Sequence, residues 1–488
     1  MAETTPQAND VEKKDDIVNE SSSPQDFPGD NIPKWAKKFD EWRRRVMSEL
    51  VYLLWLAFFI GLAAGFAAHI FNRLISIVSD IFLVHINPHK LNWWLIPVPV
   101  VGILLTGIYT RYVIHTNLTH GVTQLSRALS RQMYKIKRNI VYSPIIGGTL
   151  TLGFGGTAGS EGPIAYSGAA IGSNVGRVLG VKPEMMKILI ACGSGAAISG
   201  IFMSPMGGVL FVLEYLKMEI GTFPVLAVTL ACLVAYGLVF VCNGCVAGHT
   251  FTPSEVLEPG QYWAVLALGV FCGLYALYYS SVINRTDDIF ISIKNPWIRN
   301  ISGGLIVGVS IFLFPALYGV GYPVISQSIH SHFTDLISGN ILLGISMGEW
   351  EMMIVALCIL AIKCWGCGSC NACGGVSSDF APTMFAGGIA GFLFATFCNH
   401  VLGMHLPVGV FVFLGMGGVM AGAVEAPLMT IFIVLSMGMS FDFALAITLT
   451  VYISYITVRL GSHLRGYDSM MMRHLHWFRH HDSSKAAS

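Results

Sequence analysis

Glu161 is the residue whose type and surroundings point most directly to chemistry. It lies in the stretch GTAGSEGP, where glycines allow a tight turn and Pro163 suits the first turn of a following helix. A helix that begins there would direct free backbone N–H groups and the positive end of its dipole towards the space beside the carboxylate. Such a place attracts an anion, and a carboxylate can occupy it when no anion is bound. The alternative is that Glu161 only caps the helix.

The second half of the chain contains a related helix start. Residues 374–382 read GGVSSDFAP, and Pro382 matches Pro163 at an offset of 219, which places Phe380 opposite Glu161. Two such helix starts that converge on one point would form an anion site without any full positive charge. An ion could bind there strongly enough to be selected and weakly enough to be released.

A further pair of segments indicates that the two halves are related by a repeat. Residues 193–213 and 415–435 are both apolar, glycine-rich and broken by a proline. Four pairs coincide at one offset of 222, namely Gly193 and Gly415, Gly195 and Gly417, Gly200 and Gly422, and Pro205 and Pro427. Interrupted apolar segments at matching positions predict a membrane transport protein with its site at the repeat interface. The alternative is a chance likeness between glycine-rich helices.

The composition predicts the membrane as the environment of these segments. The chain has 488 residues, of which 54% are hydrophobic and 12% charged, and its mean hydropathy is +0.63. These values exclude an ordinary soluble globular domain. Several apolar stretches are too short to span a bilayer alone, since about 20 residues are needed. We therefore predict an all-α polytopic membrane protein of roughly fourteen to eighteen helices, several of them re-entrant or broken.

Charge and polarity suggest how the chain is organised around these helices. Basic residues cluster at 34–45, 127–138 and 459–479, so the positive-inside rule places these segments and both termini in the cytoplasm. The first apolar run begins near residue 50 and is too long for a cleavable signal peptide. The expected segments are a disordered tail at 1–32, an amphipathic cytoplasmic helix at 33–46, membrane repeats at 47–246 and 261–468, a linker at 247–260 and a cytoplasmic tail at 469–488.

At this point the chain resembles a known family, the CLC chloride channels and proton/chloride antiporters. The family's motifs G-[RK]-E-G-P and G-G-[IV]-F-A-P are similar to GSEGP and SSDFAP here, with Ser160 in place of the basic residue and residues 377–379 in place of Gly-Gly and an apolar residue. The resemblance covers about residues 47–468. It implies the CLC-type inverted-repeat fold, a homodimer with one pore per subunit, and anion transport gated by Glu161.

The resemblance also implies which residues bind the anion. His120 takes the place of the family's serine in the stretch Thr119 to Thr123, and a neutral or protonated imidazole can donate a hydrogen bond to an anion. His120 displaced from the pore is the alternative, as is a surface position for Tyr467, which resembles the family's inner-gate tyrosine. Chloride is the expected anion, with nitrate, bicarbonate and fluoride left open. The predicted anion-binding residues are Thr119, His120, Gly121, Ser160, Gly162, Phe380, Ala381 and Tyr467.

Proton coupling depends on the stretch Leu210 to Tyr215. Antiporters of the family usually carry two adjacent glutamates here, whereas this chain has Glu214 followed by Tyr215. A tyrosine, with a pKa of about 10 in model peptides, would not readily relay protons at neutral pH. Glu161, Glu214 and Tyr215 are the candidate proton pathway, and a purely structural Glu214 is the alternative. We predict a proton-coupled anion antiporter, with a passive voltage- or pH-gated anion channel as the alternative.

Four cysteines are not explained by this resemblance. Cys364, Cys367, Cys370 and Cys373 recur with two-residue gaps in CWGCGSCNAC. Such thiolates can ligate zinc or an iron–sulfur cluster, which gives a membrane redox or metal protein as a remote alternative. A redox-sensitive disulfide, or simple packing in a loop rich in small residues, are the other interpretations. We expect no enzymatic activity, no cofactor and no nucleic-acid partner, and a prokaryotic inner membrane as the location.

Overall fold

The chain folds almost entirely into helices. The computed structural model describes residues 33–85, 92–116, 118–119, 121–219, 221–246, 253, 255–322, 324–325, 348–438 and 442–465. Over these ranges it contains sixteen α-helices and no strand beyond one isolated bridge. This confirms the predicted all-α polytopic class. The expected tails at 1–32 and 469–488 lie outside the described residues, as do residues 247–252 and 254 of the expected linker at 247–260.

The first half of the chain supplies the helices labelled α1 to α9. They are α1 (Lys34–Val46), α2 (Glu49–His85), α3 (Pro97–Ile108), α4 (Gly121–Ser130), α5 (Ser143–Gly153), α6 (Glu161–Leu179), α7 (Pro183–Phe202), α8 (Pro205–Leu210) and α9 (Thr222–Cys242). Short turns of other helix types connect them at η3 (Trp93–Leu95), η4 (Tyr109–Ile114), η5 (Arg138–Val141) and η6 (Phe211–Tyr215).

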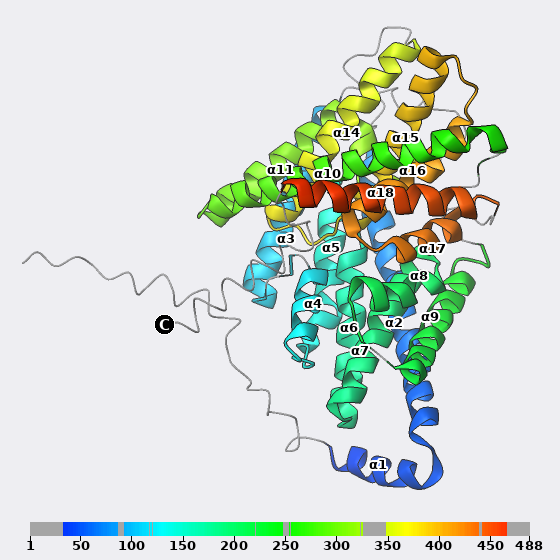
Figure 1. The fold of residues 1–488 in the computed structure, drawn as a ribbon. Coiled ribbons are helices and arrows are strands. Elements are labelled where there is room, and N and C mark those ends of the chain that lie inside the picture. Colours follow the sequence, from blue (N-terminus) through cyan, green and yellow to red (C-terminus); the bar gives the residue numbers. More distant parts are fainter. Residues whose placement is uncertain are drawn as a thin grey trace, which may run out of the picture.

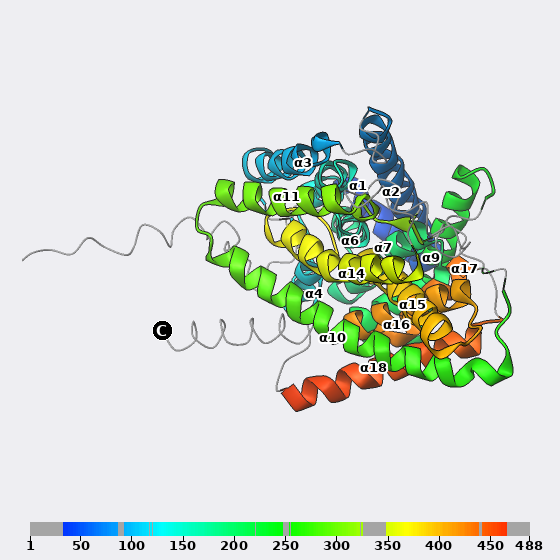
Figure 2. The same cartoon turned by 90° about the horizontal axis from the view of Figure 1, so that it is seen from above.

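The second half supplies the helices from α10 onwards. They are α10 (Tyr262–Ser292), α11 (Pro296–Leu313), α14 (Glu349–Ala372), α15 (Phe380–Leu402), α16 (Val408–Val424), α17 (Pro427–Gly438) and α18 (Ala444–Arg465), with short turns η7 (Pro259–Gln261) and η8 (Pro315–Leu317). In Figure 1 these helices lie above α4 and α6–α9. Seen from above in Figure 2, α11 lies along α3 and α10 lies along α18, and both pairs are in contact.

The helices differ in their ability to cross a membrane. Among the described residues, nine are long and apolar enough to do so. Three further apolar helices are shorter, at Pro205–Tyr215, Val408–Val424 and Pro427–Gly438. Two of the short ones follow the prolines that match across the repeat, because a proline begins a helix well and cannot continue one. The predicted broken helices are therefore present in both halves.

The repeat is also a repeat of helix packing. In the first half α6 crosses α7 so closely that a Cβ at Gly168 would overlap the carbonyl oxygen of Gly193. In the second half α15 crosses α16 in the same way, and a Cβ at Gly387 would overlap the carbonyl oxygen of Gly415. The two contacts match at offsets of 219 and 222. Small residues allow such backbone contact between membrane helices.

One contact marks where the two halves meet. The backbone N–H of Gly159 donates to the carbonyl of Ser378 over 2.7 Å, and the N–H of Ser378 donates back to the carbonyl of Gly159 over 2.9 Å. These residues are each other's counterparts at the offset of 219. An antiparallel bridge between equivalent residues places a local two-fold relation between them. The loops that precede α6 and α15 therefore lie side by side and run in opposite directions at this bridge.

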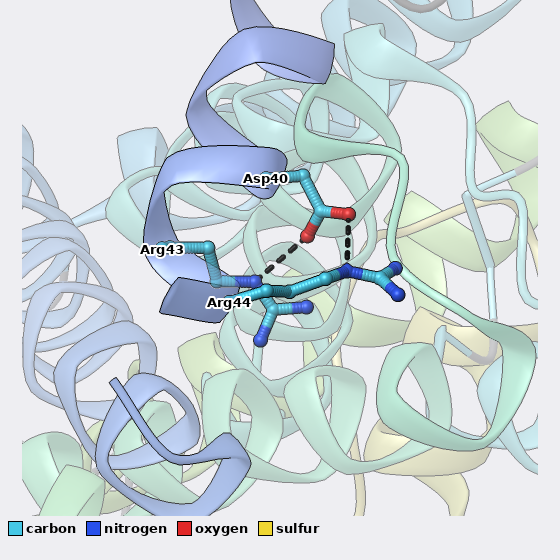
Figure 3. Close-up of polar contacts among 3 residues, drawn as sticks. All are labelled: Asp40, Arg43 and Arg44. Atoms are coloured by element: carbon cyan, nitrogen blue, oxygen red, sulfur yellow. Dashed lines mark hydrogen bonds and ion pairs between the residues drawn. The ribbon is translucent and has the colours of Figure 1, made fainter. Parts of the chain in front are cut away.

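Helix α1 lies at one end of the bundle, just before the first turn of α2, and contacts α6 (Figure 1). Asp40 accepts hydrogen bonds from Arg43 Nε over 2.7 Å and Arg44 Nε over 2.8 Å (Figure 3). Partial burial raises the pKa of Asp40, but the hydrogen bonds and charges of the two arginines outweigh burial, so its pKa lies below the usual value. The Arg43 guanidinium also lies 4.0 Å from the ring centroid of Tyr52, which joins α1 to α2.

The prediction of a loop for residues 364–373 is wrong. Helix α14 continues to Ala372, and Cys373 is its C-terminal capping residue. Glycine and serine weaken a helix by propensity, but burial among other helices outweighs that preference.

Candidate functional site

The carboxylate of Glu161 lies between the starts of two helices. Glu161 is the first residue of α6 and is 0% exposed. Its Oε2 accepts a hydrogen bond from the hydroxyl of Ser378 over 2.8 Å, and its Oε1 accepts one from the hydroxyl of Tyr322 over 3.4 Å. The backbone N–H groups of Glu161 itself and of Ala381 also donate to it. The carboxylate is therefore held from both halves of the chain.

The second helix start has the same form and a different side chain. Phe380 is the first residue of α15, as Glu161 is of α6, and it is buried. Its ring packs edge-on against Tyr215 at 5.0 Å between centroids and against Phe211 at 6.2 Å. Glu161 and Phe380, which the sequence pairs across the repeat, thus occupy equivalent positions at the starts of their helices.

Two more of the predicted residues flank Glu161 on its own helix. Ser160 occupies the N-cap position of α6, is buried, and makes no capping hydrogen bond with its side chain. Gly162 lies so close to the second half that a Cβ there would come within 2.8 Å of the Cβ of Ser378.

A third helix start reaches the same region. Gly121 begins α4, and a Cβ there would lie 3.3 Å from the carbonyl oxygen of Gly162 on α6. The carbonyl of Thr119 accepts a hydrogen bond from Gln124 Nε2 over 2.8 Å, which orders the turn before α4. Gly121 therefore joins the Glu161 region, whereas the predicted residues His120 and Tyr467 lie outside the described residues.

The candidate proton residues Glu214 and Tyr215 have separate surroundings. Glu214 accepts hydrogen bonds from the backbone N–H groups of Leu428 over 3.1 Å and Met429 over 2.7 Å, at the start of α17. Tyr215 stacks on Phe211 at 5.5 Å and meets Phe380 as described above. Glu214 thus accepts hydrogen bonds at the start of a short helix, while Tyr215 lies beside the start of α15.

The four cysteines of α14 turn to different neighbours. Spacing by three residues rotates each side chain by about 60° from the one before, so the four do not share one face. Cys364 Sγ lies 3.2 Å from the Tyr275 hydroxyl, and Cys367 Sγ lies 3.1 Å from Asp379 Oδ1. Among the described residues no group of three or more His, Cys, Asp or Glu side chains is placed to hold a metal ion.

Sequence reasoning missed several polar partners. Ser378 holds Glu161 directly, and its match with Gly159 across the repeat was a usable signal, because counterparts meet at a two-fold relation. Tyr322 lies in a stretch without a motif and gave no signal. Lys363 is a fully buried lysine on α14. It is the one charged residue after an apolar run at 352–362, and an ionisable residue in such a run marks a candidate site by itself.

The arrangement defines a chemical class. A buried carboxylate takes hydrogen bonds from backbone and hydroxyl donors at two helix starts, which are the donors that a small anion would use. These donors lie at the interface of an inverted repeat. This is the architecture of a membrane anion transport protein.

Comparisons with known proteins agree with that class. The family model for voltage gated chloride channels matches residues 101–459, and the chain therefore belongs to the CLC family. It is 27% identical over 394 residues to a ClcB-like chloride channel protein of Ralstonia nicotianae, a match that covers 79% of this chain and 86% of the relative. It is 25% identical over 413 residues to the H(+)/Cl(−) exchange transporter ClcA of Vibrio campbellii, covering 82% and 84%.

Solved structures share the fold. A slow cyanobacterial Cl−/H+ antiporter has a TM-score of 0.72 at 20% identity, covering 87% of this chain and 97% of that one. A CLC-type fluoride/proton antiporter has a TM-score of 0.67 at 22% identity, covering 84% and 95%. The predicted CLC-type fold is confirmed, and CLC-family anion transport follows as the general activity. These relatives are transport proteins, in keeping with an assignment outside the enzymes.

Proposed function

We propose that this protein exchanges a small monovalent anion, most readily chloride, for protons across a membrane, with Glu161 as the gate. The observation that carries the proposal is the position of the Glu161 carboxylate, which is fully buried and held from the starts of both α6 and α15. The relatives support the choice of substrates, because one of them is an exchange transporter for protons and chloride and another is an antiporter for fluoride and protons.

The gating step follows from competition for donors. With Glu161 ionised, its oxygens accept from the Ser378 hydroxyl and the Ala381 N–H, and an anion is excluded. When a proton binds to a carboxylate oxygen, the group becomes neutral and gains little from the helix dipoles. The anion then takes the released donors, which include the N–H groups around Gly162. Release of the proton restores the carboxylate and displaces the anion.

Two residues, Glu214 and Tyr215, define the inner half of the proton path. Tyr215 stands where antiporters of the family usually carry a glutamate, and Glu214 is engaged at the start of α17. Coupling then requires a different acid or a path through water to Glu161. A passive anion channel is the second candidate, and Tyr215 is the observation that favours it.

One experiment separates the two candidates. Purified protein in vesicles is given a chloride gradient while anion flux and external pH are recorded together. An exchanger drives proton uptake against its gradient, and its reversal potential departs from the chloride Nernst value. A channel shows no proton uptake and reverses at that value. Absence of anion flux altogether would refute both candidates.

We extend the proposal to assembly and location. The protein is proposed to form a homodimer with one anion pathway per subunit in a prokaryotic inner membrane, with both termini in the cytoplasm. The basic clusters support this orientation through the positive-inside rule, and α1 with its exposed Trp35 and Trp42 fits an interfacial helix. Subunit counting in bilayers and accessibility of terminal tags from each side test these statements.

A further inference from the structure

Lys363 is a buried cation that the gating step does not use. It lies on α14 with 0% of its surface exposed. Its Nζ donates a hydrogen bond to Thr157 Oγ1 over 2.7 Å and lies 4.7 Å from the ring centroid of Phe385 on α15. Within the described part of the chain, no carboxylate lies at ion-pair distance from this ammonium group.

A buried charge of this kind requires compensation. Removing an ammonium group from water costs more than one hydroxyl and one aromatic face return, so buried lysines are normally paired with an anion. The neighbouring thiols of Cys364, Cys367 and Cys370 are poor candidates for the countercharge, because a thiol in apolar surroundings stays uncharged. Two of them also have other partners. Cys364 contacts Tyr275, and Cys367 contacts Asp379, whose carboxylate also accepts from Asn371 Nδ2 over 2.7 Å.

Thr157 connects this lysine to the gate. It is fully buried in the loop between α5 and α6, four residues before Glu161. Its oxygen accepts from Lys363, so its own O–H is left to donate, and it makes no other hydrogen bond among the described residues. Helix α14 packs tightly on this loop, since a Cβ at Gly366 would lie 2.8 Å from Thr157 Cγ2. The Lys363 ammonium and the Thr157 hydroxyl thus offer two hydrogen-bond donors at the loop between α5 and α6.

We propose that Lys363 and Thr157 form a second anion subsite, which holds a monovalent anion while Glu161 occupies the place between the helix starts. The inference rests on the proposed anion transport and adds a fixed cation to a site otherwise made of helix starts and hydroxyls. The anion at Lys363 supplies the missing countercharge. One of its two donors, Thr157, lies in the loop that leads into Glu161.

The direct test is diffraction from crystals of the wild-type protein soaked in bromide, whose anomalous signal locates the ion without any variant. The subsite predicts a bromide peak within hydrogen-bond reach of Lys363 Nζ. The same peak should vanish in Lys363→Met, which keeps the volume and removes the charge. A wild-type structure with no bromide at Nζ overturns the inference. A peak that survives in Lys363→Met marks an adventitious ion only and overturns it as well.

Transport gives a second, independent readout. Lys363→Met should raise the half-saturating chloride concentration of flux about tenfold, and Thr157→Val, which keeps the lysine, should raise it about threefold. Lys294→Met removes an exposed lysine between α10 and α11 and is the matched control, expected to change nothing. Unchanged half-saturation in a folded Lys363→Met or, if that variant does not fold, in Thr157→Val contradicts the subsite. Wild-type vesicles without flux would refute the proposed function, while the bromide measurement still decides the subsite.

Discussion

The first residues of α6 and α15 occupy equivalent places in the two halves and carry opposite chemistry. Glu161 presents a buried carboxylate to the donors of both halves, whereas Phe380 presents a ring that packs on Tyr215. The backbone around them is matched, down to the bridge between Gly159 and its own counterpart Ser378. The scaffold is thus symmetric and the chemistry is not. Under the proposed function one gate is enough, because donors from both helix starts reach the Glu161 carboxylate.

The short helices α8 and α17 also combine a matched backbone with different side chains at equivalent positions. Glu214 accepts hydrogen bonds at the start of α17, and its counterpart at the offset of 222 is Ser436. The Ser436 hydroxyl lies 2.8 Å from that of Ser204, which caps the start of α8. Both positions therefore contact the start of the other half's short helix, one with a charge and one without.

The strongest test of the shared scaffold is to fill its glycine crossings. Gly168→Ala and Gly387→Ala each place a methyl group against a backbone carbonyl of the crossing helix. Each should lower the free energy of unfolding by about 2 kcal/mol, as overpacking does. Thermal unfolding in detergent measures the loss for each variant separately.

A matched control exists in α9. Nothing lies within 4 Å of a Cβ placed at Gly237, so Gly237→Ala should stabilise its helix by about 0.5 kcal/mol through propensity. Clearly unequal losses at Gly168 and Gly387 would break the claim that the two crossings are equivalent.

An intermediate effect is expected where the halves differ in charge. Glu214→Gln keeps one acceptor oxygen and removes the charge that favours the positive end of α17, at a cost of about 1 kcal/mol. Ser436→Ala should cost less, about 0.5 kcal/mol, because one neutral hydroxyl contact is lost. Unfolding and proton-coupled flux are measured for both variants. Full stability together with lost proton coupling in Glu214→Gln would instead make Glu214 part of the proton path.

The smallest effect concerns selectivity at the third helix start, which precedes α4. If His120 donates a hydrogen bond to the anion, His120→Ser should change the ratio of chloride to nitrate or bicarbonate permeation about threefold. Gly121 at the start of α4 lies against Gly162, so the neighbouring backbone remains in place in this variant. Competition flux assays measure the ratio. An unchanged ratio at normal expression would leave the role to Thr119 and backbone N–H groups.

Patterns in the sequence were sufficient for the fold and for the pairing of Glu161 with Phe380. Prolines and glycines at fixed offsets report backbone requirements, which are shared by the two halves, so Gly193, Gly415 and both helix starts could be located in advance. The helical state of residues 364–373 could not, because burial of a small-residue stretch overrides its propensity.

Polar partners were harder to predict than backbone features. Tyr322 and Lys363 reach Glu161 and Thr157 from parts of the chain far away in sequence. Such contacts depend on how helices cross, and a single sequence does not encode that in a local pattern. Lys363 was conspicuous only by its charge within an apolar helix.

The central claim is that the Glu161 carboxylate competes with the anion for the donors at two helix starts. Glu161→Gln imitates the protonated gate, and anion flux from vesicles across a range of pH is the measurement. The account predicts steady flux without the pH dependence of the wild type, and no proton uptake driven by a chloride gradient. A variant that keeps the wild-type pH profile would show that Glu161 only caps α6, and would contradict the account.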